Sequence, residues 1–147
     1  RTFIKPTQEE RVSSVHLKLS VLESVVKDKR IVLVDDSIVR GTTIANLIHM
    51  LKEAGAKEVH VRISSPPFLH PCYFGTDVPS NDQLIAASHS TEEICKMIGA
   101  DSLGYMQTDY LEGMAGGLPL CKACFDGNYP MEIPDYTNAE FADIVKC

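Results

Sequence analysis

The stretch IVLVDDSIVRGTT, residues 31–43, constrains the fold of this chain more than any other segment. Four aliphatic residues bounded by charge predict a short, fully buried strand, and two adjacent acids close it. From Thr42 to Ala54 the apolar residues recur at the spacing of an amphipathic helix, and Gly55 stands where a left-handed C-terminal cap belongs. Residues 58–64 then alternate like a strand. This order of elements predicts a βαβ unit, and therefore an α/β fold with a parallel sheet and a right-handed crossover.

Further elements are expected downstream of this unit. Two capping patterns, Ser80 with Gln83 and Ser90 with Glu93, predict two helices that begin at the serines. Residues 102–106 predict a last strand. The C-terminal part shows little hydrophobic periodicity, and we expect it to form an irregular lobe over the core.

The loop between the first strand and the helix has the composition of an anion site. The first N–H groups of a helix have no intrahelical partner and lie at the positive end of its dipole. The main chain of residues 39–43 could therefore bind a phosphate, with the hydroxyls of Ser37, Thr42 and Thr43 as extra donors. Gly41 would let the backbone approach closely.

The paired acids before this loop require a different ligand group. The carboxylates of Asp35 and Asp36 repel phosphate, but they accept hydrogen bonds from hydroxyls and bind hard cations such as Mg²⁺. A ribose 5-phosphate would satisfy both halves of the loop. The alternative is that these acids only form a turn and cap the helix, which is the usual role of a short motif of this kind.

The five cysteines, Cys72, Cys95, Cys121, Cys124 and Cys147, leave several chemistries open. The CKAC pair is compatible with zinc, a redox pair, an iron–sulfur cluster or simply two thiols. With Cys72 it could supply three thiolates of a [4Fe–4S] cluster. Cys95 falls in a predicted helix and is expected to be a small buried apolar residue, and the terminal Cys147 is expected to be incidental.

Charge and composition exclude some classes of function. The formal net charge of −6 and the pI of about 5.3 argue against a nucleic-acid-binding protein, which needs a basic face. No apolar run is long enough to span a bilayer, and no secretory leader precedes the chain, so we expect a cytoplasmic protein without a membrane partner. Because the chain does not begin with Met, we expect it to be a segment of a longer protein.

The motif resembles that of a known family. The run VLVDDSIVRGTT resembles the phosphoribosyl pyrophosphate (PRPP) signature of type I phosphoribosyltransferases. The resemblance extends over nearly the whole chain, and is densest from Arg1 to Ser102. It narrows to the C-terminal part of the glutamine PRPP amidotransferase family through five flanking segments: RTFIKPTQEER, SSPPFLHPCYFG, QLIAASHS, IGADSL and CKACFDGNYP.

The resemblance implies a role for each residue of the signature. Asp35 and Asp36 would be catalytic and would hold the ribose hydroxyls, directly or through Mg²⁺. The remaining PRPP-binding residues would wrap the 5-phosphate, mostly by main chain: Ser37, Val39, Arg40, Gly41, Thr42 and Thr43. Arg1 and Lys5 would belong to a flexible catalytic loop that closes over PRPP and excludes water.

The family reaction would be transfer of ammonia, released from glutamine, to C1 of PRPP. The product would be 5-phosphoribosylamine, in the first committed step of purine synthesis. Residues 1–106 would be the C-terminal part of the phosphoribosyltransferase domain, and residues 107–147 a C-terminal helix and cysteine-bearing tail. The glutaminase half and the first strands of the transferase core would lie outside this chain, so the chain alone is expected to be inactive.

The resemblance also implies cofactors and partners. In the cluster-bearing branch of the family, Cys72, Cys121 and Cys124 would ligate the [4Fe–4S] cluster, and the fourth ligand would lie outside this chain. The expected partners are PRPP, glutamine-derived ammonia, purine nucleotides as feedback inhibitors, the N-terminal glutaminase half and further copies of the protein.

Three other functions remain compatible with the signature. The first is a salvage or pyrimidine phosphoribosyltransferase, which would bind a base instead of ammonia. The second is a non-catalytic regulator that senses PRPP through the same turn. The third is a metal-stabilised structural lobe that binds no ligand.

Overall fold

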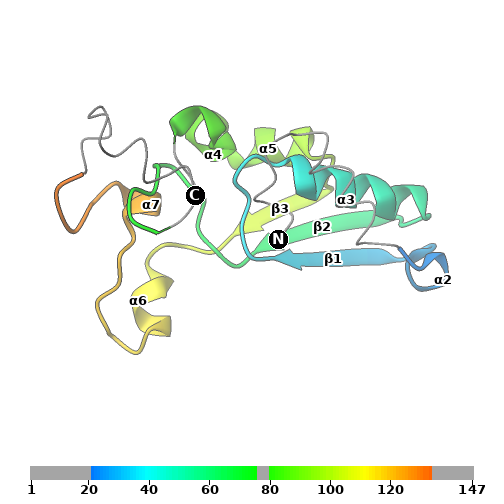
Figure 1. The fold of residues 1–147 in the computed structure, drawn as a ribbon. Coiled ribbons are helices and arrows are strands. Elements are labelled where there is room, and N and C mark those ends of the chain that lie inside the picture. Colours follow the sequence, from blue (N-terminus) through cyan, green and yellow to red (C-terminus); the bar gives the residue numbers. More distant parts are fainter. Residues whose placement is uncertain (1–20, 76–79, 134–147) are drawn as a thin grey trace.

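The computed structural model describes residues 21–75 and 80–133 of the chain, which are the coloured parts of Figure 1. The described elements follow in the order α2 (Glu23–Val26), β1 (Arg30–Asp35), α3 (Thr42–Glu53), β2 (Glu58–Ile63), η2 (Asn81–Gln83), α4 (Ile85–Ser88), α5 (Thr91–Met97), β3 (Ser102–Tyr105), α6 (Tyr110–Met114) and α7 (Ala123–Asp126). The expected strand, helix and strand at the start of the signature are confirmed as β1, α3 and β2.

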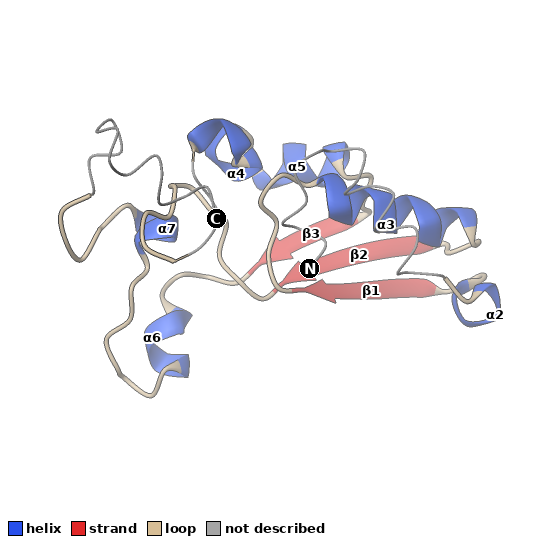
Figure 2. Cartoon of the chain, viewed as in Figure 1, coloured by secondary structure: helices blue, strands red, loops and turns tan. Residues whose placement is uncertain are grey.

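The three strands form one parallel sheet in the order β1-β2-β3. Arg30 of β1 is in register with Glu58 of β2, and His60 of β2 with Ser102 of β3. Helices α3, α4 and α5 lie on one face of this sheet (Figure 2). The predicted α/β architecture with a parallel sheet is therefore confirmed. Because all three strands run the same way, their carboxyl ends share one edge, where ligands bind in sheets of this kind.

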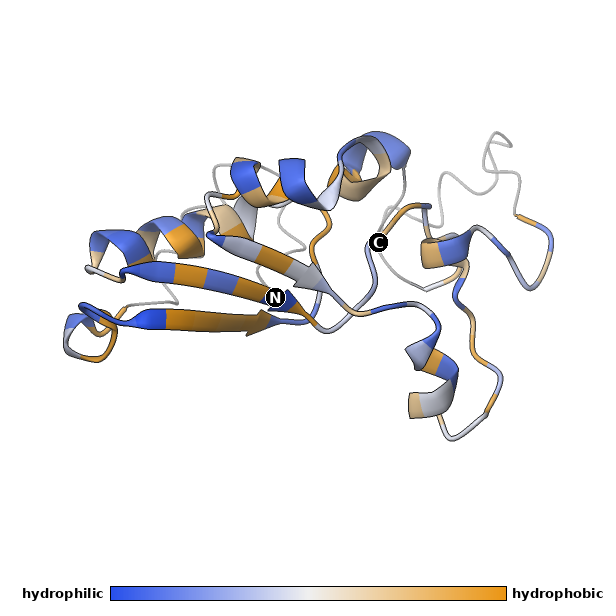
Figure 3. Cartoon of the chain, turned by 180° about the vertical axis from the view of Figure 1, so that it is seen from behind, coloured by the Kyte–Doolittle hydropathy of each residue, from blue (hydrophilic) through white to orange (hydrophobic). Residues whose placement is uncertain are grey.

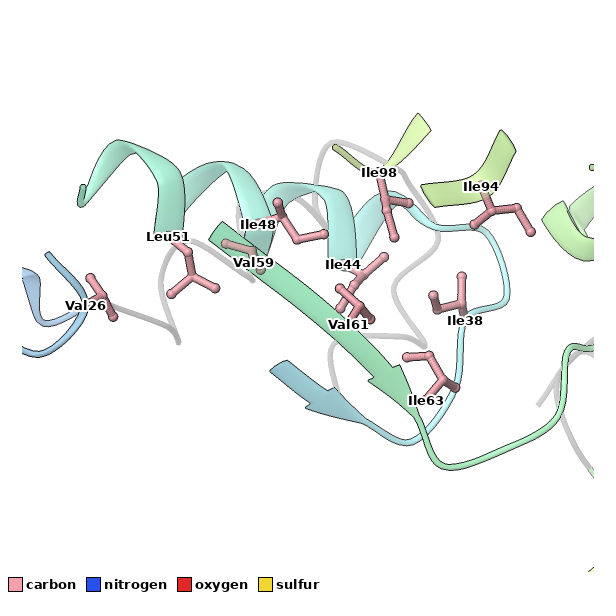
Figure 4. Packing of buried hydrophobic residues seen from close by; sticks show 10 residues of the cluster. All are labelled: Val26, Ile38, Ile44, Ile48, Leu51, Val59, Val61, Ile63, Ile94 and Ile98. Atoms are coloured by element: carbon pink, nitrogen blue, oxygen red, sulfur yellow. The ribbon is translucent and has the colours of Figure 1, made fainter. Parts of the chain in front are cut away.

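The core lies between the sheet and α3. The apolar stripe of α3 consists of Ile44, Ile48 and Leu51, at the spacing of one helix face. It packs on Val59 and Val61 of β2, which are both 0% exposed (Figure 4). This packing fixes α3 along the sheet, so that the N-terminus of the helix lies near the carboxyl ends of the strands.

The opposite face of the sheet is less covered than the sequence predicts. Val32 and Val34 of β1 are 63% and 68% exposed, and Figure 3 shows β1 largely in the colour of apolar residues. The prediction of a fully buried strand was wrong for the described part of the chain. The physical reason is that β1 is an edge strand of this sheet, and the helices cover only the side where Ile31 and Leu33 point.

The two capping patterns have different outcomes. Ser90 begins α5 with a complete capping box, because its hydroxyl accepts from the Glu93 N–H and its own N–H donates to the Glu93 carboxylate. Ser80 begins no such helix: η2 is a short 3₁₀ turn without a side-chain cap, and α4 follows it. The side chain of Gln83, which would have completed the second box, instead accepts a hydrogen bond from Arg40.

A second lobe, made by residues 66–74 and 121–129, lies beyond the carboxyl ends of the strands (Figure 1). The carbonyl of Cys124 in α7 accepts from the N–H groups of Leu69 (2.9 Å) and His70 (3.1 Å). Phe68 packs on Phe125 with ring centroids 5.0 Å apart. The short helix α7 was not expected from the sequence, since the segment lacks a helical repeat. The proposed boundary between residues 106 and 107 stays a prediction.

Loss of the Ile48 side chain is expected to destabilise the fold. Ile48 is 1% exposed, so Ile48→Ala removes buried methyl groups and leaves a cavity. The free energy of unfolding should fall by about 3 kcal/mol. The measurement is urea denaturation. Ile133→Ala is the matched control, because Ile133 is 48% exposed, and should cost less than about 1 kcal/mol. Equal losses for the two variants would contradict the described core.

Candidate functional site

The two acids stand at the carboxyl end of β1. Asp35 is the last residue of the strand, and its carbonyl accepts from the N–H of Ser64 (3.0 Å), which follows β2. The Asp35 carboxylate accepts from the Asp36 N–H (2.9 Å), and the Asp36 carboxylate accepts from the Ser37 hydroxyl (2.8 Å). Asp36 is exposed and Asp35 partly exposed. Both carboxylates therefore retain oxygen atoms for a ligand.

The loop that follows ends in a helix N-terminus with open donors. Ile38, which is 3% exposed, anchors the middle of the loop in the core. Gly41 precedes α3 in the left-handed conformation, with φ 80° and ψ −14°, and no side chain caps the helix. No described residue accepts a hydrogen bond from the N–H groups of residues 38–44. A row of main-chain donors at the positive end of a twelve-residue helix is suited to bind an anion.

The structure places most of the predicted ligand-binding residues on this one turn. Ser37, Val39 and Arg40 lie in the loop, and Thr42 and Thr43 are the first residues of α3. The loop is the arc that joins β1 to α3 in Figure 1. The remaining predicted catalytic residues, Arg1 and Lys5, lie outside the described residues.

Two residues to which the sequence analysis gave no role at this site hold the loop from the side of α4. The Ile85 N–H donates to the Val39 carbonyl (2.9 Å). The guanidinium of Arg40 donates to the side-chain oxygen of Gln83. A Cβ atom on Gly41 would lie 3.1 Å from Ile85 Cδ1, so the helix also packs closely under the loop. The only related signal in the sequence is the capping pattern of Ser80 with Gln83. That pattern predicts Ser80 as the partner of Gln83, whereas the structure pairs Gln83 with Arg40.

The three candidate cluster ligands lie in the second lobe. Cys72 and Cys124 pack with Phe68 and Leu84, and Cys121 is exposed just before α7. Burial is the main cause that raises the pKa of the Cys124 thiol to about 11, and the neighbouring Cys72 and Cys121 thiols contribute to the same rise, since their thiolates would repel a charge there.

The metal-binding capacity of this lobe is incomplete in the described residues. The donor chemistry fits an iron–sulfur cluster, because three thiols are gathered on one short helix and the loop beside it. Their spacing is a poorer fit: within residues 21–75 and 80–133, no three cysteine, histidine or acidic side chains are close enough together to hold a metal ion.

Cys95 lies outside this group, in α5, as expected. Its thiol is partly buried and donates to the Ala100 carbonyl (3.3 Å), and burial raises its pKa. This is the behaviour of a packing residue, not of a reactive thiol.

The sequence of this chain is similar to proteins of known function. Residues 3–64 match the model of the phosphoribosyl transferase domain. The amidophosphoribosyltransferase of Bacillus subtilis is 51% identical over 90% of this chain, and that of Pyrococcus horikoshii is 57% identical over 88%. The chain is therefore similar to amidophosphoribosyltransferases over about nine tenths of its own length. It spans 29% and 28% of the length of these two relatives.

Solved structures of the family agree with the fold. The B. subtilis glutamine PRPP amidotransferase complexed with ADP and GMP superposes with a TM-score of 0.74 at 50% identity, covering 92% of this chain and 31% of that one. A second structure, of the allosteric regulatory enzyme of purine biosynthesis, gives a TM-score of 0.72 at 49% identity, covering 94% of this chain and 31% of that one. The predicted relationship to the amidophosphoribosyltransferases is confirmed. Among the described helices, none has the length and apolar character to cross a membrane.

Substitution of Gly41 should distort the loop. An alanine at φ 80° is strained, and its Cβ would crowd Ile85 at 3.1 Å. We expect Gly41→Ala to lower stability by about 1–3 kcal/mol and to weaken binding of ribose 5-phosphate. Thermal unfolding and calorimetry measure the two effects. Gly113→Ala is the control: it has open space around it in α6 and should be neutral or slightly stabilising.

The raised pKa of Cys124 predicts selective labelling of the metal-free protein at pH 8. Cys121 is exposed, whereas Cys124 is partly buried and its pKa of about 11 leaves very little thiolate. Its lower thiolate fraction is partly offset by the higher nucleophilicity of a more basic thiol, so iodoacetamide should label Cys124 about tenfold more slowly than Cys121. Peptide mapping measures both rates. Labelling in urea is the control, in which the two rates should converge; equal rates in the folded protein would contradict the burial of Cys124.

Proposed function

We propose that this chain forms the PRPP-binding part of an enzyme that transfers glutamine-derived ammonia to PRPP, giving 5-phosphoribosylamine in the first committed step of purine synthesis. The observation that carries the proposal is the turn at the carboxyl end of β1. It combines two open carboxylates with a row of open main-chain donors, in a chain about half identical to amidophosphoribosyltransferases. A ribose with a 5-phosphate complements both features.

The two halves of the turn have separate roles in this proposal. The N–H groups at the start of α3, with the Ser37, Thr42 and Thr43 hydroxyls, bind the 5-phosphate. Asp35 and Asp36 accept from the ribose hydroxyls or bind them through Mg²⁺, which would supply a cation for the pyrophosphate group. The acids and the amides therefore hold the sugar at two points, and fix the orientation of its C1 atom.

Catalysis then depends on positioning and electrostatic stabilisation. As pyrophosphate leaves C1, positive charge develops on the ribose ring, and the carboxylates nearby stabilise it. Ammonia attacks the C1 atom as the bond to pyrophosphate breaks. Arg1 and Lys5 are proposed to close over the bound substrate, in a loop outside the described residues, and to keep water away from this reaction.

The thiols of the second lobe have a structural role in this proposal. Cys72, Cys121 and Cys124 would hold a [4Fe–4S] cluster together with a fourth ligand from elsewhere in the protein, and the cluster would tie the lobe to that part. Ammonia transfer involves no electron transfer, so nothing in the reaction requires redox chemistry there. Binding of the cluster requires the thiols to lose their protons. The high pKa of Cys124 opposes this loss until a metal is present.

The proposed partners follow from the family. The relatives are about three times longer than the region matched here, and the additional length is where we place the glutaminase half. The B. subtilis enzyme was solved with ADP and GMP, which supports purine nucleotides as feedback inhibitors of this protein also. We further propose a cytoplasmic homo-oligomer. A salvage transferase, a PRPP-sensing regulator and a ligand-free structural lobe are disfavoured, because the similarity includes the CKACF tail and spans nine tenths of the chain.

Binding of PRPP tests this function in the full-length protein that contains the chain. The affinity for PRPP should be higher with Mg²⁺ than with EDTA. Asp36→Asn should weaken binding by about 2 kcal/mol, or about 30-fold in Kd, because it removes a charged acceptor of hydroxyls and metal. Asp109→Asn is the control, since Asp109 is exposed and caps α6 with no side-chain bond. Calorimetry measures all four affinities. Unchanged binding by Asp36→Asn, or no binding by the wild type, would refute the proposed site.

A further inference from the structure

The side chain of Arg40 is hydrogen-bonded to a distant segment of the chain. Arg40 lies in the loop two residues before α3, where a guanidinium could be expected to contact a phosphate directly. Instead it donates to the Gln83 side-chain oxygen, 43 residues further along the chain. Gln83 is a partly exposed residue of η2, so this bond holds a surface side chain in one place.

A main-chain bond and a packing contact reinforce this engagement. The Ile85 N–H donates to the Val39 carbonyl, next to Arg40. The side chains of Ile85 and Ile98 lie 3.1 Å and 3.5 Å from the position of a Cβ on Gly41, directly under the left-handed residue. We call Gln83, Ile85 and Ile98 the loop bracket. It touches each of the three residues 39–41, and its members come from η2, from the first residue of α4 and from the C-cap of α5.

The bracket has a physical consequence for anion binding. Main-chain donors bind a phosphate well only if they already point to a common centre, because otherwise binding must also order the loop. A loop that contains a glycine has many alternative conformations, and each fixed residue costs about 1–2 kcal/mol of conformational entropy. A loop held by the bracket has lost this freedom before the ligand arrives.

We propose that Gln83 is a positioning residue for the phosphate loop: its side chain holds Arg40, and with the Ile85 main chain keeps residues 39–41 in the conformation that presents their N–H groups to the 5-phosphate. The inference deepens the proposed function and rests on it. Gln83 itself contacts no substrate; it acts through Arg40. Its loss therefore weakens binding of every ligand that carries the 5-phosphate, whether or not a pyrophosphate is present.

The test uses Gln83→Met in the full-length protein, since methionine keeps the length of the side chain and removes the acceptor. The Kd for PRPP and the Kd for ribose 5-phosphate should both rise by about tenfold, which corresponds to the loss of one hydrogen bond to a charged group. KM for PRPP should rise, whereas kcat should stay within about twofold of the wild-type value. The reason is that a phosphate held equally in the ground and transition states contributes uniform binding. Gln83→Glu keeps an acceptor oxygen and should restore wild-type affinity.

Two controls separate positioning from general destabilisation. Asn81→Leu makes a similar polar-to-apolar change on an exposed side chain of the same 3₁₀ turn, and should leave both affinities unchanged. Gln83→Met should also melt within a few degrees of wild type. In a double-mutant cycle, Arg40→Met with Gln83→Met should bind no more weakly than Arg40→Met alone, because Gln83 acts through Arg40.

The outcomes distinguish this inference from the proposed function. If the wild type binds neither PRPP nor ribose 5-phosphate, the proposed function fails, and the inference fails with it. If the wild type binds both and Gln83→Met binds them equally well, the inference alone is overturned. Additive effects of the Arg40 and Gln83 substitutions on affinity would overturn it also. So would a Gln83→Glu variant that binds as weakly as Gln83→Met.

Discussion

The packing of the α3 stripe on β2 is the constraint on which the rest of the structure depends. Ile44 and Ile48 meet Val59 and Val61 across the layer, with all four side chains almost completely removed from water. This contact sets where α3 begins relative to the strands. The open N–H groups of its first turn consequently lie at the same edge as the carboxylates that end β1. The site that we propose for a ligand with a phosphate and hydroxyls is therefore positioned by a hydrophobic contact.

The loop between these elements shows how a flexible segment can be made suitable for binding. Gly41 permits the left-handed turn that frees the first amides of α3. The same glycine would leave the loop loose if nothing else held it. Ile38 anchors it in the core, while the Val39 carbonyl and the Arg40 side chain are bonded to the segment around α4. These restraints use a carbonyl and a side chain of the loop, and no described residue occupies its main-chain donors.

The second lobe contributes a different kind of order. Its two segments lie about fifty residues apart in sequence, and they are joined by the bonds from Leu69 and His70 to the Cys124 carbonyl and by packing of Phe68 on Phe125. The lobe lies beyond the carboxyl ends of the strands, near the candidate ligand site (Figure 1). Its three thiols share one region, although the described residues alone do not close a metal site. In the proposed function, a fourth ligand from elsewhere in the protein would complete the site.

The sequence by itself determined the elements whose signal is local: the period of α3, the cap at Ser90, the glycine after α3 and the paired acids at the end of β1. Each of these follows from side-chain spacing or backbone angles within a few residues. Only the tertiary structure decided the partner of Gln83 and the exposure of Val32, because both depend on contacts between distant segments. A glutamine three residues after a serine can complete a capping box, but it bonds to Arg40 here since folding brings that stronger, charged donor within reach. Likewise, an aliphatic strand is buried on both faces only if a second layer covers it.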